Sequence, residues 1–167
     1  QRLKLTVAYV THDQSEALAV SDQIVLMNAG LIAQAGTPRE LYEQPSSEFV
    51  AGFMGEAMLF DAHLEPKGRL RLGPLVLPMA SDAGALLGDV KVAIRPEAWS
   101  LSSSTDPEGL AGTVKKQAYL GNVQELTLDT ALGDIFVVSA DVARDWQVGD
   151  AAKLALSARG VAVVARS

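Results

Sequence analysis

A histidine between two polar residues, Thr11-His12-Asp13, stands where an apolar segment meets a run of helix-forming residues. Residues 5–10 form the apolar segment, and residues 14–20 are rich in glutamate, alanine and leucine. Where a strand leads into the first turn of a helix, backbone amides converge and favour a phosphate group. His12 is therefore the candidate for phosphate chemistry. On the alternative interpretation these residues form a polar turn in which Asp13 caps the helix.

Other kinds of site are excluded by composition. The sequence contains no cysteine, which rules out a disulfide scaffold, a thiolate zinc site and a cysteine nucleophile. Two histidines alone do not make a conventional metal site, so we expect no metal. A hydrolase that used His12 and Asp13 would lack a credible nucleophile.

The charge balance narrows the range of partners. The formal net charge is −6, so the overall field does not attract phosphate backbones or anionic lipid, and we expect no nucleic-acid partner. The apolar stretches fall short of the roughly 20 residues that a membrane helix needs, and Pro74 and Pro78 interrupt one of them. We therefore expect no direct insertion into a membrane.

The first third of the chain predicts a mixed α/β arrangement. Residues 5–10 suit a strand buried on both faces of a parallel sheet, and a short helix follows at residues 14–20. Residues 24–27 and 31–34 flank a turn that contains Gly30, which predicts a β-hairpin. Thr37 and Glu40, with proline between them, form the pattern of a capping box for a helix that ends near residue 44. A serine at 46 or 47 then caps another short helix, which ends near Gly55.

After residue 55 the helical periodicity gives way to short strands separated by turn residues, so we place a domain boundary there, with domains at 1–55 and 56–167. The number and spacing of the strands predict a small barrel or sandwich. Gly133 lies in the turn of a predicted hairpin. Arg95, which ends a strand, is a candidate ligand contact, or else it forms a surface ion pair or a turn contact. His63 is expected to be an ordinary strand residue. The strand candidates are residues 70–72, 90–94, 113–119, 125–128, 135–138, 153–156 and 161–164.

Two long strings of the sequence resemble one known family. YVTHDQSEAL at residues 9–18 and SDQIVLMNAGLIAQAGTPRELY at residues 21–42 are similar to the end of the nucleotide-binding subunit of ABC importers. VAIRPE at 92–97 and YLG at 119–121 resemble its transport-associated OB-like (TOBE-type) domain. The resemblance implies an α/β remnant of the ATPase domain followed by an all-β OB-like barrel.

The resemblance assigns His12 to the switch loop, whose histidine contacts the γ-phosphate of ATP. An imidazole can donate to a phosphate oxygen while its other nitrogen is held by a neighbour. No Gly-x-x-x-x-Gly-Lys-Ser/Thr string occurs in the sequence. We therefore expect a C-terminal portion of a transport ATPase that does not hydrolyse ATP alone and holds no cofactor, whereas the complete subunit uses ATP and magnesium.

The resemblance also implies partners and a location. A second copy of the subunit and membrane permeases are expected partners, together with a small regulatory ligand at the OB-like domain. The subunit is expected to be cytoplasmic and peripheral on the inner face of the plasma membrane. Residues 55–60 point to iron(III) or polyamine uptake within a branch that also serves sulfate and sugars. The alternative function is an autonomous β-barrel module that senses small oxyanions such as molybdate, with residues 1–55 as a dimerisation arm.

Overall fold

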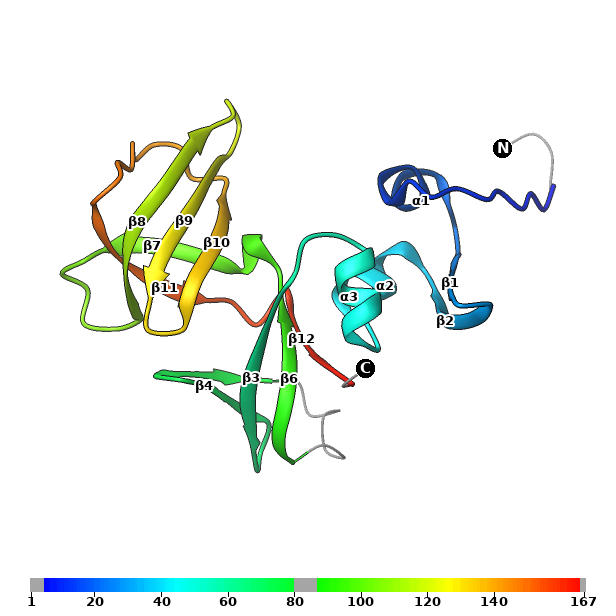
Figure 1. Ribbon diagram of the computed structural model, residues 1–167, viewed down its shortest axis with the longest axis horizontal. Coiled ribbons are helices and arrows are strands. Elements are labelled where there is room, and N and C mark those ends of the chain that lie inside the picture. The colour runs from blue at the N-terminus through cyan, green and yellow to red at the C-terminus, as the bar shows by residue number, and fades with distance from the viewer. Residues whose placement is uncertain (1–4, 80–86, 166–167) are drawn as a thin grey trace.

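The computed structural model describes residues 5–79 and 87–165, and Figure 1 shows them as a helix-and-hairpin segment followed by two β-sheets. Asp13 and Thr37 cap the first two helices, and Ser47 caps the third. Ala29 and Gly30, with φ of 48° and 82°, turn the chain between the two strands of the hairpin. These local signals can be recognised in the sequence. The three predicted helices and the predicted hairpin before residue 55 are confirmed. The elements are α1 (Gln14–Val20), β1 (Ile24–Asn28), β2 (Leu31–Gly36), α2 (Pro38–Glu43) and α3 (Glu48–Phe53).

The strand predicted at residues 5–10 is wrong for this structure. No regular element forms there, and Val7 and Val10 are 78% and 96% exposed. An apolar run of this kind becomes a buried strand only when other strands pair with its edges and cover its faces. Among the residues that the structure describes, no strand pairs with this segment, so its backbone has no ladder to join.

Two five-stranded antiparallel sheets make up the rest of the described chain (Figure 1). The first sheet has the order β12-β6-β3-β4-β5, and the second has the order β10-β9-β8-β11-β7. The strands are β3 (Met58–Glu65), β4 (Arg69–Leu72), β5 (Leu75–Pro78), β6 (Gly88–Ile94), β7 (Trp99–Ser103), β8 (Leu110–Tyr119), β9 (Gln124–Thr130), β10 (Gly133–Ser139), β11 (Ala151–Leu156) and β12 (Val161–Val164), with a 3-10 turn η2 (Pro96–Ala98) before β7.

One hydrophobic core joins the two sheets. Leu64 and Leu70 of the first sheet belong to the same buried cluster as Leu128 and Ile135 of the second sheet. The architecture is therefore mostly β, with curled sheets that share an interior. All seven strand candidates from the sequence correspond to strands, and Gly133 lies at the predicted hairpin turn. The strand candidates did not include β3, β5 and β7.

The helices of the described residues are short, at six or seven residues each. None of them has the length and apolar character required to cross a membrane.

Candidate functional site

His12 lies exposed on a bend between residues 5–11 and helix α1. The following residue, Asp13, caps α1, because its Oδ1 accepts hydrogen bonds from the amides of Ser15 at 2.8 Å and Glu16 at 3.1 Å. The capping interpretation of Asp13 is thereby confirmed. The cap fixes the position at which α1 begins, and therefore the direction in which the chain leaves His12.

Two hydroxyl groups attach the segment before His12 to the first turn of α1. Oε2 of Glu16 accepts a hydrogen bond from Tyr9 at 3.1 Å and another from Thr11 at 3.0 Å. Thr11 Oγ1 in turn accepts from the amide of Asp13 at 3.0 Å. The bend that carries His12 is thus held from both sides by side chains of its own neighbours.

A pocket of about 290 Å³ lies beside this bend. Its wall contains His12 and Gln14 together with Phe53 and Met54 from the end of α3. Oε1 of Gln14 is buried and has no hydrogen-bond partner among the described residues. No role for Gln14 could be predicted, since no pattern in the sequence shows that its side-chain oxygen is buried.

The second histidine has a different environment. His63 lies on β3, as expected for an ordinary strand residue, and its Nδ1 is 2.8 Å from Oδ1 of Asp89 on β6. Both side chains are exposed. No group of three or more metal-ligating side chains occurs in residues 5–79 and 87–165.

Arg95 follows β6 and is almost completely buried, with 2% of its surface exposed. Its Nη1 donates to the carbonyl oxygens of Ala51 at 2.9 Å, Gly55 at 3.0 Å and Glu56 at 3.1 Å. Its Nη2 donates to the carbonyl oxygen of Tyr42 at 3.1 Å. Burial lowers the pKa of the guanidinium, and the nearby Tyr42 and Glu97 oppose this effect. Arg95 thus holds α2 and α3 against the first sheet, and contact with a regulatory ligand remains an untested prediction.

Tyr42, which is partly buried, links Arg95 to the exposed Glu97. Its ring lies 4.2 Å from the guanidinium carbon of Arg95, and its hydroxyl donates to Oε1 of Glu97 at 2.8 Å. Burial, together with the hydrogen bond and the charge of Glu97, raises the pKa of Tyr42 from 10.0 to about 12, while Arg95 acts in the opposite direction. The sequence did not reveal these contacts, because Tyr42 lies 53 residues before Arg95 and 55 residues before Glu97.

We expect this raised pKa to produce a loss of stability in alkali. The folded state holds the phenolic proton more tightly than the unfolded state, so the stabilisation is complete below pH 10 and is lost as the pH rises toward about 12. Unfolding by urea, measured at intervals over this pH range, should show a decline that is smaller in Tyr42→Phe. Equal declines in the two proteins would contradict the assignment.

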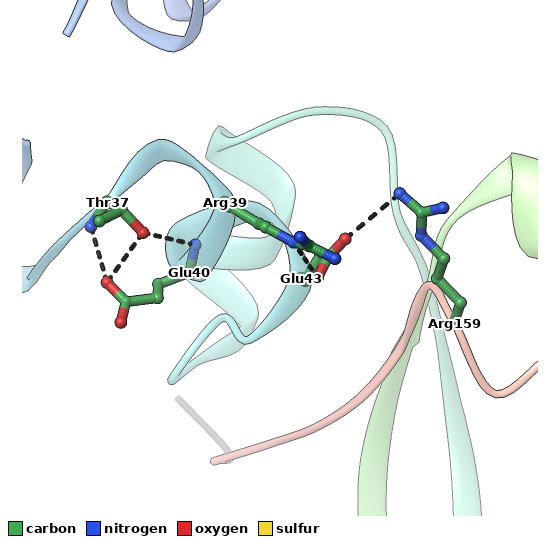
Figure 2. Close-up of polar contacts among 5 residues, drawn as sticks. All are labelled: Thr37, Arg39, Glu40, Glu43 and Arg159. Carbon is green, nitrogen blue, oxygen red and sulfur yellow. Dashed lines mark hydrogen bonds and ion pairs between the residues drawn. The ribbon is translucent and has the colours of Figure 1, made fainter. Parts of the chain in front are cut away.

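A further set of contacts ties α2 to the second part of the chain (Figure 2). Oε2 of Glu43 accepts from Nε of Arg39 at 2.9 Å, and its Oε1 lies 3.4 Å from Nη2 of Arg159.

Hydrogen bonds from Thr37 lower the pKa of Glu40. Figure 2 also shows the capping box, in which the Thr37 hydroxyl accepts from the Glu40 amide and the Glu40 carboxylate accepts from the Thr37 amide.

Removal of this cap should have a moderate cost. We expect Thr37→Ala to lower the free energy of unfolding by about 1 kcal/mol, since the backbone amide of Glu40 at the start of α2 would lose its side-chain acceptor. Thr37→Ser keeps the hydroxyl and should retain most of the stability in the same denaturant titration. A Thr37→Ala protein as stable as the parent would show that the box contributes nothing.

Comparison with known proteins gives the family context. The TOBE domain model matches residues 92–164. Proteins named Fe(3+) ions import ATP-binding protein FbpC are similar over 98% of this chain: that of Rhizobium etli is 41% identical and that of Agrobacterium fabrum 38% identical. The protein of the same name from Mannheimia succiniciproducens is 41% identical over 82% of this chain and 39% of its own length.

The chain spans about half the length of the curated relatives it matches, at 47% of the R. etli and A. fabrum proteins. Among solved structures, the cytoplasmic molybdate-binding protein ModG is similar with a TM-score of 0.45 and 20% identity, over 62% of this chain and 92% of that chain. The chain is thus homologous over 98% of its length to ATP-binding subunits of ABC importers, corresponds to their C-terminal part, and contains a TOBE domain.

Proposed function

We propose that this chain is the C-terminal portion of the ATP-hydrolysing subunit of an ABC importer for iron(III). The observation that carries the proposal is the identity of 38–42% to proteins named for Fe(3+) import, over 98% of the chain. The match extends over 98% of the chain and therefore includes both the His12 segment and the β-rich part. A β-barrel module joined to an unrelated arm would share only the second of these.

In this proposal residues 1–55 complete the nucleotide-binding domain, and residues 56–167 serve subunit pairing and regulation. His12 contacts the γ-phosphate of ATP, while the remainder of the subunit holds the β-phosphate and magnesium. The exposed position of His12 on a bend held by Asp13 and Glu16 supports this role, because the imidazole can reach a group outside the described residues. The expected partners are a second copy and two permeases, at the cytoplasmic face of the membrane.

A hybrid subunit provides the test. These 167 residues replace the matched part of the R. etli protein, and the hybrid is assembled with the R. etli permeases in proteoliposomes. We expect ATP hydrolysis and uptake of iron(III) that depend on the iron-binding protein of that system. A folded and assembled hybrid without ATP hydrolysis would overturn the proposal.

The oxyanion-sensing alternative gives a different result in a simpler experiment. A ligand that binds only the folded state raises the midpoint of thermal unfolding. Molybdate or sulfate at millimolar concentration should leave the midpoint of the 167-residue chain unchanged if the chain is part of an iron importer. A rise with molybdate together with an inactive hybrid would favour the sensor.

A further inference from the structure

Helix α3 is packed on two sides by different parts of the molecule. Val50 and Met54 are buried in a cluster with Leu26 of β1 and Leu41 of α2. On its other side, Ala51 is buried with Ala93 of β6 and Val164 of β12. Figure 1 shows the same arrangement, with α3 between the N-terminal hairpin and the first sheet. Because the contact with the sheet is made by small residues, the helix and the strands approach closely.

Arg95 fixes the C-terminal end of this helix. The last carbonyl groups of a helix have no partner within the helix, and a cation at that end is favourable. Nη1 of Arg95 supplies the missing donor to Ala51, and also binds the carbonyl oxygens of Gly55 and Glu56 just beyond the helix. A Cβ on Gly55 would lie 3.4 Å from Nη1 and 3.2 Å from the Tyr42 ring. The fit around the guanidinium is therefore tight.

The same end of α3 reaches the His12 pocket. Phe53 and Met54 line that pocket together with His12 and Gln14. Leu18 of α1, the helix that follows His12, packs against the cluster that contains Met54. A displacement of α3 along or about its axis would therefore move one wall of the pocket and the packing of α1 together.

We propose that α3 and Arg95 couple the part of the chain that contains the TOBE match (residues 92–164) to the bend that carries His12. Arg95 is a positioning residue in this coupling. The guanidinium holds the end of α3 against the end of β6. The position of β6 therefore determines where Phe53 and Met54 lie in the wall of the His12 pocket. The consequence for ATP hydrolysis rests on the proposed function of His12. The mechanical coupling rests only on the contacts of α3.

The coupling can be tested in the 167-residue chain by NMR, because its two histidines give two separate imidazole signals. Arg95→Met removes the donors and keeps an apolar side chain of similar length. We expect the His12 signal to move by more than its line width, since the Phe53 ring changes position, while the His63 signal stays in place. Arg159→Ala, which removes an exposed ion pair between the same two parts, should move neither signal.

If Arg95→Met does not fold, Arg95→Lys keeps the charge and should produce a smaller movement of the His12 signal. An unchanged His12 signal in a folded Arg95 variant would overturn the coupling. This result does not depend on whether the protein is an ATPase subunit.

The consequence for activity is measured in the hybrid subunit. Arg95→Met should lower kcat for ATP hydrolysis by about tenfold, in line with coupling through a packed element, and should leave KM for ATP unchanged. Arg159→Ala should retain the parent kcat. If the parent hybrid is inactive, the proposed function fails and the NMR result still decides the coupling. An active hybrid with an unchanged kcat in Arg95→Met would show that Arg95 is structural only.

Discussion

His12→Ala in the hybrid subunit is expected to lower kcat for ATP hydrolysis by about 10²–10³-fold, the range typical of removing one hydrogen-bond donor from a developing anionic charge. The imidazole would donate to the γ-phosphate, and a methyl group cannot replace that bond. The measurement is steady-state release of inorganic phosphate at saturating ATP. His63→Ala provides the matched control, because His63 is the only other histidine and lies on β3 in an exposed pair with Asp89.

His12→Ala should have almost no effect on the stability of the 167-residue chain. His12 is exposed and belongs to none of the hydrophobic clusters of the described residues. The free energy of unfolding of the 167-residue chain should therefore change by less than about 0.5 kcal/mol. A large loss of stability, or full ATP hydrolysis by the His12→Ala hybrid, would contradict the assignment of His12 to the phosphate.

Arg95→Met is expected to cause the largest loss of stability of any substitution considered. Removal of the guanidinium leaves the carbonyl oxygens of Ala51, Gly55, Glu56 and Tyr42 without this donor. Buried and partly buried acceptors that lose a charged partner should lower the free energy of unfolding by about 3 kcal/mol. For a chain of this size the midpoint of thermal unfolding should fall by about 6–12 °C. Urea unfolding followed by circular dichroism and by tryptophan fluorescence provides the measurement.

Arg159→Ala is the control for this experiment. Its side chain is 82% exposed and pairs with Glu43 at 3.4 Å. Exposed ion pairs contribute little, so the midpoint should remain within measurement error of the parent. If the two variants lost the same stability, the burial of Arg95 would have no energetic importance and the assigned role of its four acceptors would be wrong.

Local signals explain why much of the fold could be predicted. The caps at Asp13, Thr37 and Ser47 act through side chains that bond amides two or three residues away, so the residue types themselves reveal them. The hairpin turn at Gly133 is equally local. The omitted strand β3 shows the limit: His63 was expected in a strand, but the partner of that strand is β6, and their pairing bridges about thirty residues.

The sequence by itself determined the short helices, the hairpins and the position of His12 before α1, because each depends on neighbouring residues. Only the tertiary structure decided the environment of Arg95 and the state of residues 5–10. An arginine after a strand becomes either exposed or buried according to which carbonyl groups lie opposite it, and here they come from residues 42–56. An apolar run becomes a strand only when another strand supplies the hydrogen bonds along its edge.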